Sequence, residues 1–129
     1  MQDSESAVHR IEPPKRVFVI GSVRDASPED RVRMEDYVAL LEENGTTVHL
    51  PHRDTNQNAS GLEICQQNYH AIRGADEVHV FYCSKSQGTH FDLGMAFALG
   101  KPIVVTGNEP YGPGKSFARM IEEWQEFNY

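Results

Sequence analysis

The sequence lacks long hydrophobic runs and any signal for export. Its uninterrupted apolar stretches, such as residues 17–20 and 95–99, fall far below the ~20 residues that a membrane span requires. No basic segment followed by an apolar one opens the chain, as it does in secretory signal peptides. We therefore expect a cytoplasmic protein with no membrane partner.

Basic residues and cysteines are also scarce. The 12 Lys and Arg residues stand against 19 Asp and Glu, which gives a formal net charge of −7. Polymeric nucleic acid is therefore excluded as a partner, because neutralising its phosphates takes clustered Lys and Arg. A small anionic ligand held by one loop is not excluded. Cys65 and Cys83 have no metal-ligand spacing, and the 6 histidines form no ligand set, so we expect buried reduced thiols and no metal site.

Familiar cofactor and nucleophile motifs are missing as well. The chain contains neither the GxGxxG fingerprint nor a Walker loop, which argues against dinucleotides and nucleoside triphosphates, and we expect no cofactor. It also has no G-x-S-x-G nucleophile elbow, so the serine hydrolases built on that motif are excluded.

What the chain does contain is a regular alternation of short β-branched runs and longer amphipathic segments. Its 129 residues fit one domain. Residues 1–14 are polar and end in two prolines, which predicts a disordered tail, and residues 15–129 form the single domain. The alternation predicts an α/β fold, a flavodoxin-like or Rossmann-like three-layer sandwich with a parallel sheet of four to five strands. The predicted strands are residues 17–20, 46–50, 77–83 and 102–106, and a fifth strand is short or absent, because only residues 126–129 are left to form it.

Capping residues place the helices between these strands. Ser27 before Pro28 begins the first, and the capping-box spacing of Ser60 and Glu63 begins the second. Thr89 is the expected cap of the third helix and Ser116 that of the last. Because ligands bind beyond the carboxyl ends of the strands in such folds, the loops that follow the strands are the places to search for chemistry.

Two of these loops carry suitable residues. After the first strand, Gly21 lets the backbone approach a ligand, Ser22 supplies a hydroxyl, and Arg24 supplies a fork suited to phosphate. The alternative is a turn in which a solvated Arg24 pairs with Asp25. After the third strand, the hydroxyls, Gly88 and the helix N-terminus predict a cradle for an anion or a sugar.

Asp92, which follows this cradle, has two interpretations. It lies three residues after Thr89, where an acid completes a helix cap and favours the helix dipole. The other interpretation is a catalytic carboxylate beside a hydroxyl-rich loop. His90 is the one histidine whose neighbours suggest a role in the same site.

Together these segments resemble the nucleoside 2-deoxyribosyltransferase family, and most closely its 2′-deoxynucleoside 5′-monophosphate N-hydrolase branch. The resemblance runs from about residue 16 to residue 124. It rests on residues 21–24 (GSVR), on residues 75–76 (AD), and above all on residues 86–102 (SQGTHFDLGMAFALGKP), which are similar to the family's S-x-G-(T)-x-x-E-L-G-x-A-x-A-L-G-K-P signature.

The resemblance implies cleavage of the N-glycosidic bond of a nucleoside or a nucleoside 5′-monophosphate through a carboxylate nucleophile, with release of the sugar to water or to a new base. By position, Asp92 is the nucleophile and Asn68 stands where an acidic residue on the second helix assists. The family also implies a homodimer or higher homo-oligomer in which Ser116, near the start of the last helix, reaches the phosphate of the neighbouring subunit. The residues that would hold the sugar or its phosphate are Gly21, Ser22, Val23, Arg24, Ser86 and Gly88.

Two residues depart from the family pattern. Asp92 replaces a glutamate, which withdraws the carboxylate by on the order of 1.5 Å, and a misplacement of ~1 Å can slow a reaction roughly 100-fold. Asn68 can hydrogen-bond a sugar but cannot transfer a proton, and loss of general acid–base help costs about 10²–10⁴-fold. His90, Tyr69 and His70 are the candidates in sequence to take over protonation.

Three functions remain open on the sequence. The first is an active N-glycosidase or deoxyribosyltransferase. The second is a nucleotide-binding module of the same family that has lost the chemistry. The third is cleavage of a different N-glycoside, such as a nicotinamide nucleotide, whose cationic leaving group needs no general acid and therefore tolerates the neutral Asn68.

Overall fold

Four parallel strands form one sheet at the centre of the protein. The structure, a computed structural model, describes residues 15–107 and 114–128, so the expected tail at residues 1–14 and Tyr129 lie outside the described residues. The sheet has the order β3-β2-β4-β5. In this arrangement the strand order reverses between β2, the first strand in the sequence, and β4, the third. The strands are β2 (Arg16–Ile20), β3 (Thr47–His49), β4 (Glu77–Phe81) and β5 (Ile103–Thr106).

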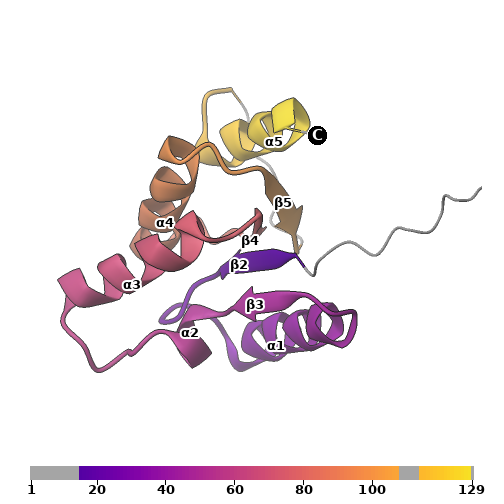
Figure 1. Ribbon diagram of the computed structural model, residues 1–129. Helices are drawn as coiled ribbons and strands as arrows, with labels where there is room; N and C mark the ends of the chain where they lie inside the picture. Colours follow the sequence, from indigo (N-terminus) through magenta and orange to yellow (C-terminus); the bar gives the residue numbers. More distant parts are fainter. Residues whose placement is uncertain (1–14, 108–113, 129) are drawn as a thin grey trace, which may run out of the picture.

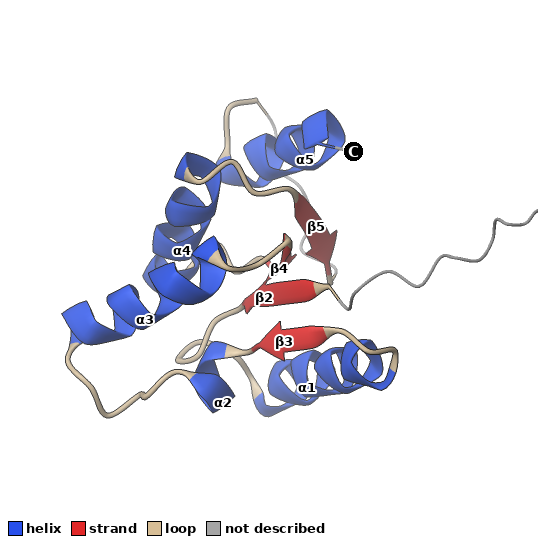
Figure 2. Ribbon diagram, viewed as in Figure 1, coloured by secondary structure: helices blue, strands red, loops and turns tan. Residues whose placement is uncertain are grey.

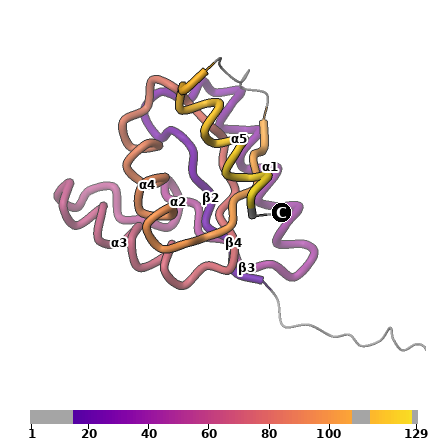
Figure 3. The backbone as a smooth tube through the Cα atoms, turned by 90° about the horizontal axis from the view of Figure 1, so that it is seen from above, coloured from indigo at the N-terminus to yellow at the C-terminus, as the bar shows by residue number. Residues whose placement is uncertain are grey.

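Helices lie on both sides of this sheet, as the alternation predicts. α1 lies on one side of the strands, and α3 and α4 lie on the other (Figure 3). α5 runs beside β5, at the edge of the sheet (Figures 1 and 2). The fold prediction is therefore confirmed as a four-stranded, all-parallel α/β architecture. The helices are α1 (Pro28–Glu43), α2 (Pro51–Asp54), α3 (Gly61–Arg73), α4 (Gln87–Ala98) and α5 (Phe117–Asn128).

Alternation along β2 divides the core into two clusters. Val17 and Val19 face α1 and pack with Val38 and Val48, while Phe18 and Ile20 face the opposite side. The larger cluster lies on that opposite side, where α3, α4 and α5 contribute Ile72, Leu93, Ala96, Ile121 and Trp124. A strand that is buried on both faces reads as a continuous apolar run, which is why residues 17–20 contain no polar residue.

The helix boundaries differ from the prediction at one place that matters. The N-cap of α4 is Ser86, whose Oγ accepts a hydrogen bond from the backbone N–H of Thr89 at 3.0 Å. The predicted cap, Thr89, is instead a buried residue inside the first turn. Both residues are good caps, and the sequence alone does not choose between them. The helix therefore begins one turn earlier, and Asp92 lies in its second turn.

Three details of the chain become definite in the structure. Residues 126–128 continue α5 and do not begin a fifth strand. Pro51 does more than end the second strand, because it opens the short helix α2, where proline is tolerated at the first position. The two cysteines are free thiols, as expected, but they are half-buried and not fully buried.

Candidate functional site

A cavity of about 470 Å³ opens where the loops after β2 and β4 meet α3 and α4. This is the edge of the sheet at which the carboxyl ends of the strands meet, and ligands bind there in folds of this type. The cavity brings together eight of the ten residues that the sequence singles out. They are Gly21, Ser22, Val23, Arg24, Asn68, Ser86, Gly88 and Asp92.

Asp92 is the buried carboxylate of this cavity. Its side chain projects from the second turn of α4, and the residue is only 8% exposed. Burial raises the pKa of Asp92 from 3.8 to about 7, and a hydrogen bond from Asn68 opposes that rise. An acid in the second turn does not cap the helix, so the structural interpretation of Asp92 as part of a cap is wrong.

Asn68 comes from α3 and is 6% exposed. Its Oδ1 accepts a hydrogen bond from the Thr55 hydroxyl at 2.6 Å. Because that oxygen is occupied, the NH₂ group of Asn68 is the part of the amide that meets Asp92. Asn68 therefore acts as a neutral donor to the carboxylate.

The lining around the N-terminus of α4 has the features of an anion site. Ser86 caps α4, so backbone N–H groups of the first helical turn lie at this end. Arg24 and Lys85 line the cavity with exposed side chains, and within the described part of the chain no hydrogen bond or ion pair engages either one. Two cations beside a helix N-terminus favour a negatively charged ligand group.

The two serines of this end keep a proton available for a ligand. Ser22 Oγ accepts from the backbone N–H of Asp25 at 2.7 Å, and Ser86 Oγ accepts from Thr89. In both cases the hydroxyl oxygen is the acceptor, so its own hydrogen can be donated to an oxyanion. Gly88 adds open space, because a Cβ placed there would meet only Ser86 Oγ, at 3.9 Å.

The loop after β2 is held from behind by α1. A Cβ on Gly21 would lie 2.3 Å from Met34 Sδ, so this position excludes any side chain as the packing stands. Arg31 Nη2 donates to the carbonyl oxygen of Val23 at 2.7 Å. Gly21 and Val23 therefore shape the loop through their packing against α1, whereas Ser22 and Arg24 offer side chains to the cavity.

His90 and Ser116 do not line this cavity. The Nδ1 atom of His90 lies 2.7 Å from the carbonyl oxygen of Ser86 and therefore carries the ring proton, and Nε2 lies 2.8 Å from the Tyr82 hydroxyl. The ring also contacts Phe117, with centroids 5.0 Å apart. His90 thus connects α4 to α5, whereas Ser116 caps α5 with a 3.2 Å hydrogen bond from the Arg119 N–H.

Comparison with known proteins identifies the family. The sequence model of the nucleoside 2-deoxyribosyltransferase family matches residues 23–117, which is most of the chain. The chain belongs to this family. A search of curated proteins by sequence found no match.

Solved structures of the family agree with this assignment. A CMP N-glycosidase, BcmB, from Clostridium botulinum is 30% identical, with a TM-score of 0.57 and 70% of each chain covered. A 2-deoxyribosyltransferase from Leishmania mexicana is 23% identical, with a TM-score of 0.60, over 76% of this chain and 67% of the other. One from Bacillus psychrosaccharolyticus is 17% identical, with a TM-score of 0.64, over 88% and 90%. This nucleoside 2-deoxyribosyltransferase family member is therefore an enzyme of the glycosidase and transferase type.

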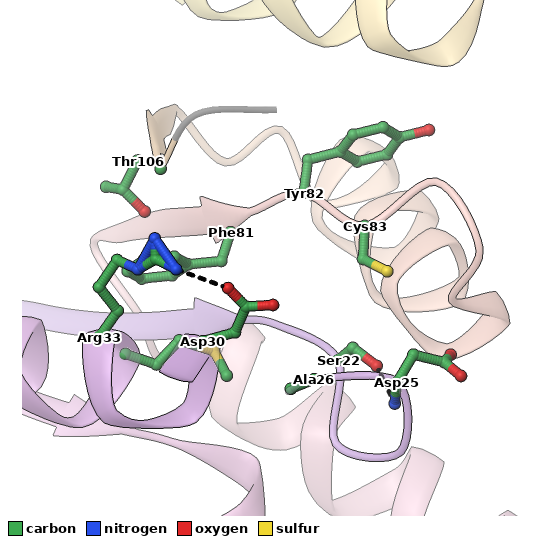
Figure 4. A pocket seen from close by; sticks show the side chains of 11 residues that line it. Ser22, Asp25, Ala26, Asp30, Arg33, Phe81, Tyr82, Cys83 and Thr106 are labelled. Atoms are coloured by element: carbon green, nitrogen blue, oxygen red, sulfur yellow. Dashed lines mark hydrogen bonds and ion pairs between the residues drawn. The ribbon is translucent and has the colours of Figure 1, made fainter. Parts of the chain in front are cut away.

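A second, smaller cavity of about 270 Å³ lies on the α1 side of the same loop. It shares Ser22 and Asp25 with the first cavity. Figure 4 shows the Arg33–Asp30 ion pair at one side of it and Asp25 and Cys83 at the other. The loop after β2 therefore separates two cavities in this family member, and of these two only the larger is lined by Asp92.

Sequence reasoning missed several residues of the site. Lys85 and Cys65 line the main cavity, and Thr55 holds Asn68. Tyr69 and His70, proposed as replacement acids, do not line it. Among the described residues no cluster of His, Cys, Asp and Glu could hold a metal ion, and none of their helices is long and apolar enough to cross a membrane.

Proposed function

We propose that the protein cleaves the N-glycosidic bond of a nucleoside 5′-monophosphate, with Asp92 as the nucleophile. The observation that carries this proposal is the composition of the main cavity. It is lined by a buried carboxylate, by two cations that no hydrogen bond or ion pair engages in the described part of the chain, and by a helix N-terminus. A nucleotide has the matching polarity, with an electrophilic C1′ at one end of its sugar and a dianionic phosphate at the other.

The spacing along α4 suits such a ligand. Asp92 lies five residues beyond Gln87, the first residue of the helix, which is a rise of about 7.5 Å along the helix axis. Helical side chains tilt toward the N-terminus and shorten that separation. The bonds from phosphorus through O5′, C5′, C4′ and O4′ to C1′ span a length of the same order. A phosphate at the helix N-terminus therefore brings C1′ near Asp92.

The reaction then proceeds in two displacements. The ionised carboxylate of Asp92 attacks C1′, a C1′–O bond forms, and the C1′–N bond breaks with its electron pair leaving on the base. Water or a second base next attacks C1′ and releases the carboxylate, which gives hydrolysis or transfer. Because Asp92 must be ionised to attack and its pKa is about 7, we expect the rate to rise as the pH increases through neutrality.

The departing base does not take its proton from position 68. The Asn68 side chain is an amide, and its oxygen already accepts from Thr55. A base that leaves as a stable neutral molecule without protonation suits this arrangement, and this is the observation that favours a nicotinamide nucleotide as the second candidate substrate. A pyrimidine nucleotide remains the first, supported by the similarity to a CMP N-glycosidase.

The test is release of free base from a panel of substrates. CMP, dCMP, the purine monophosphates, their nucleosides and nicotinamide mononucleotide are incubated with the enzyme, and the bases are separated by chromatography. Asp92→Ala is the inactive control, and Asp36→Ala, which changes an exposed carboxylate on α1, is the matched control. We expect at least one monophosphate to be cleaved by the wild type and by Asp36→Ala only. Binding of a monophosphate without base release from any substrate would instead identify a module that binds nucleotides and has lost the chemistry.

We further propose that the protein acts in the cytoplasm as a homodimer in which Ser116 reaches the phosphate bound to the neighbouring subunit. Two exposed aromatic residues outside the main cavity, Phe97 of α4 and Phe117 of α5, support a covered surface there. They are 65% and 60% exposed. Light scattering gives the mass in solution. A monomer at concentrations at which the enzyme is active would contradict the proposed role of Ser116.

A further inference from the structure

A chain of hydrogen bonds connects the end of β3 to the nucleophile. His49 Nε2 lies 2.8 Å from Thr55 Oγ1, and Thr55 Oγ1 lies 2.6 Å from Asn68 Oδ1. Asn68 and Asp92 line the same cavity, and the Asn68 amide lowers the pKa of Asp92. Thr55, Asn68 and Asp92 are all buried, with 4%, 6% and 8% of their surface exposed. The connection joins four elements and runs through the interior.

The direction of the bonds follows from the number of protons available. Thr55 has one hydroxyl proton, and it is donated to Asn68 Oδ1. The oxygen of Thr55 is then the acceptor for His49, so Nε2 of the imidazole carries a hydrogen. With Oδ1 occupied, Asn68 presents its NH₂ group to Asp92. Each group donates to the next, and such chains strengthen their own bonds.

We propose that His49 and Thr55 are positioning residues that fix the Asn68 amide with its NH₂ group toward Asp92. Neither residue lines the main cavity, so both act through Asn68. The proposal builds on the assignment of Asp92 as the nucleophile and says how the protein favours the ionised form of that carboxylate in a buried site.

The alternative orientation of the amide shows what the two residues prevent. If Asn68 flipped, its Oδ1 would face the carboxylate, and two acceptors would be in contact without a proton between them. Asp92 would then have to be protonated to donate to Oδ1, and a protonated carboxyl group cannot attack C1′. Thr55 would accept from the flipped NH₂ and donate to a His49 Nε2 that carries no hydrogen. The tautomer of His49 and the ionisation of Asp92 are therefore coupled.

The surroundings of the imidazole restrict its behaviour. The His49 ring stacks on Phe18, with centroids 5.3 Å apart and an angle of 11° between the planes. Burial lowers the pKa of His49, Asp54 of α2 raises it and Arg53 of α2 lowers it. The charged groups that line the cavity around Asp92 are Arg24, Asp25 and Lys85. Thr55 and Asn68, the two uncharged residues of the hydrogen-bond chain, therefore connect the tautomer of His49 to the ionisation of Asp92.

The decisive variant is Thr55→Val, which keeps the shape of the side chain and removes its hydroxyl. The readout is a pH titration of the Asp92 carboxyl carbon by ¹³C NMR, assigned by its loss in Asp92→Asn. We expect the midpoint in Thr55→Val to move upward by about one pH unit, because a hydrogen bond to a charged group is weakened. Thr55→Ser restores the hydroxyl and should return the midpoint to the wild-type position. Thr47→Val makes the same change at an exposed position in β3 and should leave the midpoint where it is.

Kinetics provide a second readout that a merely structural role would not reproduce. At a pH well below the Asp92 midpoint, raising that midpoint by one pH unit lowers kcat/KM about tenfold. At pH 9 the variant and the wild type should have nearly equal kcat/KM. A loss that is the same at every pH would overturn the proposal, as would an unchanged Asp92 midpoint in Thr55→Val. If the wild type turns over no substrate, the titration still tests the hydrogen-bond chain, so a failure of the proposed reaction is distinguishable from a failure of this inference.

His49→Phe keeps the stacking on Phe18 and removes the Nε2 donor. This variant replaces Thr55→Val as the test if Thr55→Val does not fold, because His49 is only half-buried and its substitution disturbs the core less. We expect the Asp92 midpoint to move in the same direction as in Thr55→Val, by a smaller amount because Thr55 can still donate to Asn68. A downward movement or no movement would contradict the proposal.

Discussion

Replacement of Asp92 by asparagine is expected to abolish the reaction and to stabilise the fold at neutral pH. The reason is the burial of the carboxyl group, which raises its pKa from 3.8 to about 7. An acid whose pKa is raised by folding stabilises the folded state fully below pH 3.8, and that contribution is lost as the pH rises toward 7. The ionised carboxylate thus weakens the protein under the conditions in which it reacts.

The size of the effect follows from the difference in pKa. A gap of about 3 pH units corresponds to about 4 kcal/mol, at about 1.4 kcal/mol for each unit. Asparagine has nearly the same shape, is neutral at all pH values, and offers an oxygen to the NH₂ group of Asn68. We therefore expect the free energy of unfolding of Asp92→Asn at pH 8 to exceed that of the wild type by about 2–4 kcal/mol. Below pH 4 the two proteins should be nearly equally stable.

Urea unfolding at several pH values, followed by circular dichroism, measures the difference directly. The matched control is Asp36→Asn, which neutralises an exposed carboxylate on α1. Only the difference between variant and wild type is used, so the other groups that titrate at low pH cancel. A stability difference for Asp92→Asn that does not change between pH 4 and pH 8 would refute the reasoning, because it would show that Asp92 is not held in a desolvated site.

Three further predictions concern the anion end of the cavity and its support. Arg24→Ala should weaken binding of a nucleoside monophosphate about 10- to 100-fold by calorimetry, through loss of a charge-assisted contact, whereas Arg16→Ala, far from the cavity, should not. Ser86→Ala removes the cap of α4 and should lower the free energy of unfolding by about 0.5–2 kcal/mol in urea, with weaker nucleotide binding as a second effect. Gly21→Ala places a Cβ 2.3 Å from Met34 Sδ and should destabilise the fold by about 1–3 kcal/mol in the same assay, and no loss would show that α1 can move away.

Local sequence patterns predicted the fold because each element obeys a local rule. The apolar run at residues 17–20 is buried on both faces, and the capping box of Ser60 and Glu63 forms as written. Gly45 and Gly100 follow α1 and α4 at φ values of 91° and 68°, in the left-handed region that glycine favours at the ends of helices. The N-terminus of α4 shows the limit of such local rules. Ser86 and Thr89 are both favourable N-cap residues, so the capping preference does not decide which of them begins the helix.

The site was predicted less completely than the fold. Motif similarity located the loops and Asp92, which lies within the signature at residues 86–102, and Asn68 was placed by its position on the second helix. It did not predict that His90 turns away toward Tyr82, because neighbours in a helix point in different directions. Thr55 and His49 belong to segments with no motif, and only the packing of α2 against the rest of the chain brings them to Asn68.

The two departures from the family pattern are physically coupled. A nucleophile shortened by one methylene withdraws toward the helix that carries it, and Asp92 is 8% exposed with its pKa raised to about 7. A second carboxylate at position 68 would raise that pKa further by charge repulsion, and the pair would share a proton at neutral pH. The neutral NH₂ group of Asn68 has the opposite effect, because it stabilises the ionised form. Asn68 therefore gives up proton transfer to the base and in return favours the ionised form of a buried aspartate, which is the form able to attack.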